Sequence, residues 1–141
     1  MQLQKAINIL KEQNYSCVVI KDDLVHCANG IGVKPIMQWL REDEAFFANA
    51  YVADKVIGKA AALLLVMAKA KSVYGKVMSE SAIAILEKYH IRYEYDTKVS
   101  FIANRTNTGM CPLEQSVVAI DAPNEAYIAI QNKIAELMSS K

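Results

Sequence analysis

Residues 54–69 read DKVIGKAAALLLVMAK, and the stretch from Ala60 to Ala68 within them is the longest apolar run in the chain. Because the segment is rich in Ala, Leu and Met, we expect a helix over Asp54–Lys69. Its apolar side chains leave almost no polar face, which is typical of a buried helix. The apolar run is too short to cross a bilayer, which needs about 20 residues.

Predicted strands and helices alternate after this helix. Ser72–Met78 reads as a strand, Ser79–Ser81 opens another helix, and Ile91–Tyr95 alternates apolar and polar residues as a half-exposed strand does. This order predicts an α/β fold with a partly parallel, mixed sheet and helices on both faces.

The two ends of the chain complete the expected architecture. Leu3, Ala6, Ile7 and Leu10 recur at helical spacing. We further expect a hairpin formed by Cys17–Ile20 and Leu24–Cys27. A short helix opened by a proline should span Pro35–Leu40, and a C-terminal helix should begin at about Asp121–Pro123. The sequence contains no evident linker or repeat, so we expect a single domain over residues 1–141.

Composition excludes several classes of protein. The 141 residues are 53 % hydrophobic, which argues against disorder, and a formal net charge of +1 argues against binding to nucleic acid or to an anionic membrane. Three widely spaced cysteines favour a reduced, cytoplasmic protein over a disulfide framework. Lys5, Lys11 and Glu12 interrupt any apolar core of an export signal.

Polar residues gather where the buried helix should begin. Asp54 would lie at the helix N-terminus, where a carboxylate accepts backbone N–H groups. Lys55 and Lys59 would share one helix face, and Gly58 in the first turns costs about 1 kcal/mol relative to Ala, which suggests close approach of a ligand or another backbone. The residues alone favour an N-cap Asp with two solvated lysines, and a phosphate-bearing ligand is the alternative.

Ser79, Glu80 and Ser81 follow a predicted strand and open a helix. Open sheets bind ligands at the carboxyl ends of parallel strands, so Ser79 and Ser81 are candidate ligand contacts and Glu80 a candidate catalytic residue. A serine cap with an acidic first turn accounts for the same residues without a ligand.

Residues 104–114 read NRTNTGMCPLE, a run of hydrogen-bonding side chains that leads into a proline-initiated helix. Cys111 would be the N-cap of that helix and Glu114 its third residue, and a Cys in this position can be nucleophilic. Arg105 is suited to clamp a phosphate or carboxylate. An ordinary loop with Cys111 as a small apolar plug is the alternative, and the residues do not decide between them. The expected hydrogen-bonding ligand contacts in this loop are Asn104, Thr106 and Thr108.

Common cofactor and metal motifs do not occur. Gly30-Ile31-Gly32 lacks the third glycine of a dinucleotide fingerprint. His26 and His90 are the only histidines, and no His/Cys set has zinc-like spacing. We therefore expect neither a metal nor a cofactor.

The stretches AYVADKVIGKAAA (residues 50–62) and NRTNTGMCPLE (residues 104–114) resemble a small prokaryotic family of uncharacterised proteins with a cytidine-deaminase-like fold. The similarity runs through nearly the whole chain, including Gly32–Pro35 and the unit around Ser79–Ser81. The resemblance implies a three-layer α/β/α sandwich, and deaminase-like folds commonly form homo-oligomers.

The resemblance does not imply deamination. Zinc deaminases carry His- or Cys-x-Glu at one helix start and Pro-Cys-x-x-Cys at the next, where this sequence has Ala53-Asp54-Lys55 and Ser79-Glu80-Ser81. Cys111-Pro112 has the reverse order and no second Cys. What the resemblance implies is two helix N-termini that converge on a metal-free pocket, an arrangement that favours an anion.

The leading hypothesis is a cytoplasmic protein that binds a nucleotide-like or phosphorylated small molecule in this pocket. Asp54 would hold a sugar hydroxyl or an amine, and the phosphate contacts would be Lys55, Lys59 and Arg105.

Two alternatives stay open. One is a non-zinc group-transfer enzyme with Asp54 or Cys111 as nucleophile and Glu80 or Glu114 as base. The other is a structural or oligomerisation module.

Overall fold

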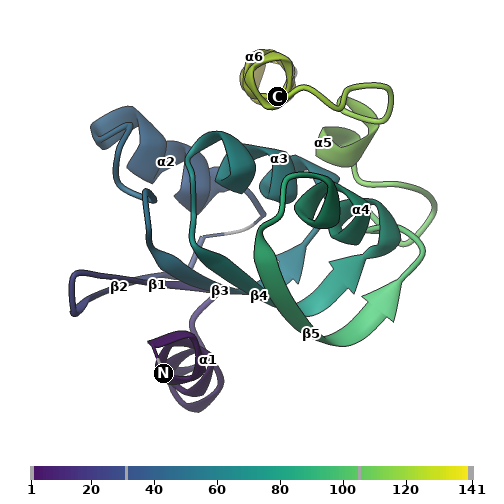
Figure 1. Ribbon diagram of the computed structural model, residues 1–141. Helices are drawn as coiled ribbons and strands as arrows, with labels where there is room; N and C mark the ends of the chain where they lie inside the picture. The colour runs from purple at the N-terminus through teal and green to yellow at the C-terminus, as the bar shows by residue number, and fades with distance from the viewer. Residues whose placement is uncertain (1, 31, 105, 140–141) are drawn as a thin grey trace.

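The computed structural model describes residues 2–30, 32–104 and 106–139. A helix, a hairpin and a second helix precede strands and helices in alternation, and a long helix ends the chain (Figure 1). The elements are α1 (Gln2–Gln13), β1 (Cys17–Lys21), β2 (Leu24–Ala28), α2 (Lys34–Glu42), β3 (Tyr51–Ile57), α3 (Lys59–Met67), β4 (Ser72–Ser79), α4 (Glu80–Lys88), β5 (Arg92–Val99), α5 (Pro112–Gln115) and α6 (Pro123–Ser139).

The five strands form one mixed sheet in the order β2-β1-β3-β4-β5. The hairpin is antiparallel and β1 is antiparallel to β3, whereas β3, β4 and β5 run parallel. The predicted α/β class with a partly parallel sheet is therefore confirmed. Because Ile57 pairs with Met78, the carboxyl ends of β3 and β4 are neighbours, and α3 and α4 both begin at this edge of the sheet.

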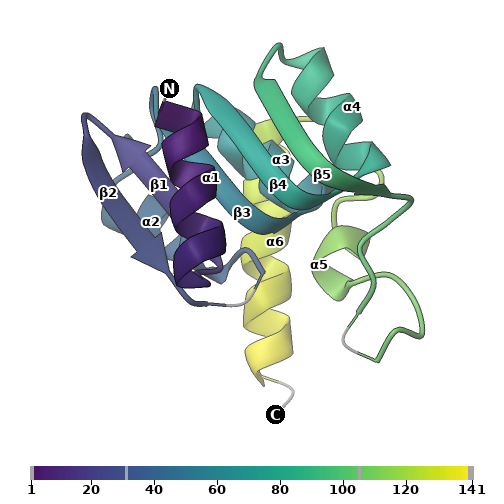
Figure 2. The same ribbon diagram turned by 90° about the horizontal axis from the view of Figure 1, so that it is seen from below.

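Helices cover both faces of the sheet, with α1 on one face and α2, α3 and α4 on the other (Figures 1 and 2). The predicted stripe of α1 (Leu3, Ala6, Ile7 and Leu10) is buried against a small core that includes Val18 and Ile20. The larger core lies under α3, whose outer side is covered by α6 through Ala126 and Ile130. None of the helices in the described ranges has the length and hydropathy of a membrane span.

The buried helix begins at Lys59 and not at Asp54, so the predicted start is wrong by five residues. Residues 51–57 instead form β3, because strand pairing on both sides and the β-branched Val52, Val56 and Ile57 outweigh the helix propensity of this segment. Gly58, in an extended conformation, is the N-cap of α3. The predicted burial of the helix is confirmed, since its residues from Lys59 to Leu65 are all buried.

The alternation of side chains along β3 is interrupted near Asp54. Val52 and Ile57 both belong to the larger core, although an odd spacing in a regular strand points side chains to opposite faces. Between them, Asp54 Oδ1 accepts a hydrogen bond from the Val56 N–H at 3.1 Å. On β4, Gly75 pairs with Asp54, and a Cβ there would lie 2.9 Å from Ile57 Cγ1. The irregularity therefore depends on a glycine in the neighbouring strand.

Candidate functional site

The N-terminus of α3 holds a carboxylate from the chain itself. Glu114 Oε1 accepts a hydrogen bond from the Lys59 N–H at 2.7 Å, and Oε2 accepts one from the Ala60 N–H at 2.9 Å. These are N–H groups that have no partner within the helix, and they lie at its positive end. Burial raises the pKa of Glu114, while the two N–H groups and the Lys59 charge oppose the rise.

Gly58 makes room for this carboxylate. A Cβ on residue 58 would lie 2.5 Å from Cδ of Glu114. The prediction that Gly58 permits a close approach is thus correct in kind, but the approaching group is the carboxylate of Glu114.

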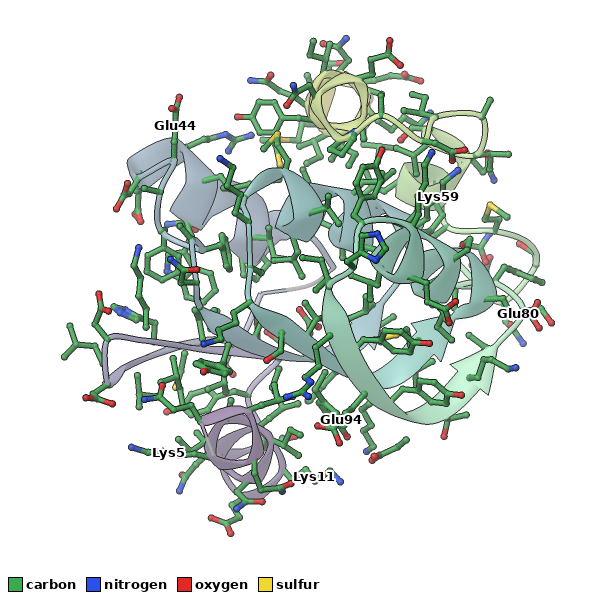
Figure 3. All side chains as sticks on the ribbon, in the orientation of Figure 1. Lys5, Lys11, Glu44, Lys59, Glu80 and Glu94 are labelled. Carbon is green, nitrogen blue, oxygen red and sulfur yellow. The ribbon has the colours of Figure 1, made fainter. Side chains whose placement is uncertain are left out.

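Lys59 is buried and is not a solvated lysine, which corrects the simpler prediction. Its Nζ donates a hydrogen bond to the Val118 carbonyl at 3.0 Å and forms an ion pair with Asp121 Oδ1 at 2.9 Å. Figure 3 shows Lys59 on the side of α3 that faces α5. We call Lys59, Glu114, Val118 and Asp121 the C-terminal clasp, because together they hold residues 114–121 against the start of α3.

Asp54 lies within β3 and is not a helix N-cap. It is buried (6 % exposed) and pairs across the strands with Cys17, which is also buried. Burial raises the pKa of Asp54 to about 7, although hydrogen bonds from the Val56 N–H and the Cys17 thiol oppose the rise. Burial, and next the Asp54 charge, raise the pKa of Cys17 well above its ordinary value. Asp54 is therefore largely protonated below pH 7, which disfavours its predicted role as a nucleophile.

Ser79 is the N-cap of α4, which agrees with the predicted serine cap. Its Oγ accepts a hydrogen bond from the Ala82 N–H at 3.1 Å and lies 3.1 Å from the Ser81 Oγ. Glu80 follows at the outer margin of the molecule (Figure 3) and is exposed. Ser79 and Ser81 thus belong to the edge where α3 begins, while the Glu80 side chain faces solvent.

Lys55 is separated from Lys59 because the two belong to different elements, so the predicted shared helix face does not exist. The Lys55 Nζ donates a hydrogen bond to Asn14 Oδ1 at 3.0 Å, directly after α1. Its ammonium group is therefore directed to the α1 side of the sheet.

In the described part of the polar loop, the side chains of Asn104, Thr106 and Thr108 hydrogen-bond to one another. Asn104 Oδ1 accepts from the Thr108 N–H at 3.0 Å, and the hydroxyl groups of Thr106 and Thr108 lie 2.8 Å apart. Arg105 lies outside the described residues. Cys111 is the N-cap of α5, as predicted, but its side chain makes no capping hydrogen bond.

An apolar groove of about 530 Å³ lies beside the edge of the sheet where α3 and α4 begin. Val56, Val77 and Val99, from three adjacent strands, line it together with Phe101. Across the described ranges, no group of three or more His, Cys, Asp or Glu side chains is placed to hold a metal ion.

The sequence identified most of the residues at this site but not the distant groups with which they form hydrogen bonds. Glu114 is the third residue of α5, as predicted, yet it caps α3, 55 residues away. Cys17 and Asp121 are not among the predicted site residues. The start of α3 also reads Gly58-Lys59-Ala60, so Ala53-Asp54-Lys55 does not occupy the helix start assigned to it.

Comparisons with known proteins agree on a family. A family model described as a domain of unknown function, DUF1893, matches residues 5–134. The crystal structure of a DUF1893 family protein (TM1506) from Thermotoga maritima is similar, with a TM-score of 0.84 and 27 % identity, and the match covers 93 % of this chain and 88 % of that chain. No curated protein matches the sequence. Since the family model spans nearly the whole chain, this protein belongs to the DUF1893 family, whose function is unknown.

Proposed function

We propose that the protein binds a nucleotide-like, phosphorylated small molecule at the carboxyl edge of β3 and β4, where a ligand phosphate exchanges with the Glu114 carboxylate. The observation that carries this proposal is the pair of hydrogen bonds from the Lys59 and Ala60 N–H groups to Glu114. Backbone N–H groups at a helix start bind phosphate and carboxylate oxygens in the same way. The absence of a side chain on Gly58 gives either group the space it needs.

The charges around this edge support exchange with an anion. Release of the clasp would free the Lys59 ammonium from Asp121, so that Lys59 can contact the incoming phosphate. Asp54, whose pKa is raised to about 7, carries little charge below that pH and so repels an anion weakly. A protonated carboxyl can also hydrogen-bond a sugar hydroxyl, both as donor and as acceptor. Ser79 and Ser81 supply hydroxyl groups at the start of α4.

We further infer a cytidine-deaminase-like, three-layer α/β/α architecture for a single domain over residues 1–141. The placement of α1 on one face and α2, α3 and α4 on the other is compatible with it (Figure 2). Zinc deaminases carry metal ligands at two helix starts. In this chain the adjacent starts of α3 and α4 carry Gly58-Lys59 and Ser79-Glu80, which is why we propose an anion there.

A second candidate function is acid–base chemistry in a non-zinc group-transfer enzyme. The specific observation is Asp54, a buried carboxyl group with a pKa of about 7, the range in which a side chain both donates and accepts protons near neutral pH. Intact-mass spectrometry after incubation with phosphorylated metabolites would detect a covalent adduct, and loss of the adduct in Cys111→Ser but not in Asp54→Asn would place it on Cys111. Turnover that survives Asp54→Asn would exclude Asp54 as the acid or base.

We also propose that the protein is cytoplasmic and forms a homo-oligomer. Cys17, Cys27 and Cys111 are free thiols, which suits a reducing compartment. Val56 and Phe101 are exposed and provide apolar surface for self-association. Size-exclusion chromatography with light scattering at micromolar protein should give a multiple of the chain mass, and a monomer would contradict the oligomer.

Isothermal titration with nucleoside mono-, di- and triphosphates tests the binding proposal. We expect Glu114→Gln to bind the best ligand about tenfold more tightly than wild type, because a neutral amide competes less well for the two N–H groups. Glu94→Gln, which removes an exposed carboxylate on β5, is the matched control and should bind like wild type. Absence of heat with every nucleotide at millimolar concentration, for wild type and Glu114→Gln alike, would exclude the proposal.

A further inference from the structure

A second groove lies at the other end of α3, away from the C-terminal clasp. It has a volume of about 600 Å³ and is formed by the end of α2, the end of α3 and the start of α6. Met67 and the aromatic ring of Tyr127, both partly exposed, contribute apolar surface, whereas Leu40 and Ala68 also line the groove but are nearly fully buried. Its size is that of a small-molecule site, and its lining combines apolar and polar side chains.

Three polar side chains that line this groove, all of them exposed, have no partner among the described residues. Arg41, Glu44 and Asn124 make no side-chain hydrogen bond or ion pair with any of the residues that the structure describes. Arg41 and Glu44 are only three positions apart in the sequence, yet they do not pair with each other. The groove therefore presents a free cation, a free carboxylate and a free amide beside an apolar surface. Figure 3 shows Glu44 projecting from the turn that follows α2.

The local charge decides which ligand suits these groups. Glu42, Asp43 and Glu44 follow Arg41 directly, so a simple anion would meet more negative than positive charge. Among the described residues that line the groove, Glu44 is the one with a carboxylate, since Glu42 and Asp43 do not line it. A suitable ligand must therefore carry its own positive charge as well as an acceptor for Arg41.

We propose that this groove binds a zwitterionic amino acid with an apolar side chain. The planar Arg41 guanidinium would donate two parallel N–H groups to the ligand carboxylate, and Glu44 would accept from the ligand ammonium group. Asn124 supplies a further donor and acceptor. The apolar side chain would lie against Met67 and Tyr127, removed from water.

A titration followed by ¹⁵N–¹H NMR tests this inference on the full chain. The probes are L-leucine and L-phenylalanine, compared with N-acetyl-L-leucine, which lacks the ammonium group, and 3-methylbutylamine, which lacks the carboxylate. We expect both amino acids to shift amide signals of residues 40–44, 67–68 and 124–127. Each truncated probe should bind at least about tenfold more weakly than leucine, because one charge-assisted hydrogen bond is lost.

Two variants assign the charged contacts. Arg41→Gln should abolish the preference for leucine over 3-methylbutylamine, and Glu44→Gln should abolish the preference over N-acetyl-L-leucine. Arg92→Gln and Glu94→Gln, at exposed positions of β5, are the matched controls and should leave both preferences intact.

Three results would overturn the inference: no shifts with either amino acid at millimolar concentration, shifts confined to other parts of the chain, or unchanged preferences in both groove variants. Glu114 and Gly58 lie at the opposite end of α3. Such a result would therefore not contradict the proposed nucleotide site, which is tested separately.

Discussion

Gly58 and Glu114 are fitted to each other, although 56 positions separate them in the sequence. A Cβ on residue 58 would lie 2.7 Å from Oε2 of Glu114 and even closer to Oε1. The same carboxylate accepts hydrogen bonds from the Lys59 and Ala60 N–H groups. The start of α3 therefore depends on a missing side chain at one position and on a carboxylate at the other.

Gly58→Ala should destabilise the protein by about 1–3 kcal/mol, because the added methyl group must displace a buried, hydrogen-bonded carboxylate. The backbone at residue 58 has φ −99° and ψ −175°, a conformation open to alanine, so we expect most of the cost to be steric. Urea unfolding measures it. Gly109→Ala is the control, since a Cβ there has no neighbour within 4 Å. It should cost less than about 0.5 kcal/mol.

The same substitution in a Glu114→Ala background tests the assigned cause. Without the carboxylate, Gly58→Ala should cost about 1 kcal/mol or less, which is the ordinary penalty of alanine at an N-cap. The two substitutions are then non-additive, as expected of residues in contact. Equal costs in both backgrounds would show that the methyl group meets something other than Glu114.

The sequence predicted elements better than it predicted contacts. The alternation of elements, the buried character of α3 and the Cys111–Glu114 helix start all follow from local patterns, which act over a few residues. The C-terminal clasp does not follow from local patterns, because the Glu114 carboxylate accepts hydrogen bonds from N–H groups of α3, which is distant in the sequence. The sequence predicts a helix start at Asp54, since Asp often begins a helix. Pairing with Cys17 on one side and with Gly75 on the other makes Asp54 part of a strand instead. Such pairing depends on tertiary structure and overrides propensity.

Asp54→Asn should remove a pH dependence of stability. The folded-state pKa of Asp54, about 7, lies above 3.8, the ordinary value of an aspartate, so between these pH values the folded protein holds a proton that the unfolded chain has lost. The free energy of unfolding of wild type, relative to the Asn variant, should therefore fall by about 4 kcal/mol as pH rises from about 4 to about 7. Urea unfolding across this range measures the difference.

Asp96→Asn provides a control of opposite sign. The nearby Tyr74 hydroxyl, and next the Lys11 ammonium, which forms an ion pair with Asp96 at 3.0 Å, lower the pKa of Asp96 in the folded state. Its contribution to stability is present above pH 4 and is lost as pH falls, so the difference curve should slope the other way. A flat or rising curve for Asp54 would contradict the raised pKa.

Lys59→Met should loosen the C-terminal segment. The substitution keeps most of the buried aliphatic stem but removes the ion pair with Asp121 and the hydrogen bond to Val118, and we expect a loss of about 1–3 kcal/mol. Hydrogen exchange should quicken in residues 114–121. Lys133→Met, which removes a more exposed pair with Glu136, should cost less than about 1 kcal/mol. Similar losses for the two variants would remove the basis for a clasp.

The central claim, that a ligand phosphate exchanges with Glu114, is tested most directly at the two N–H groups themselves. In ¹⁵N–¹H spectra recorded during addition of a nucleotide, the amide signals of Lys59 and Ala60 should shift together, and hydrogen exchange of residues 114–121 should accelerate as the clasp opens. Nucleotide additions that leave both amide signals in place and the clasp as protected as before would contradict the exchange.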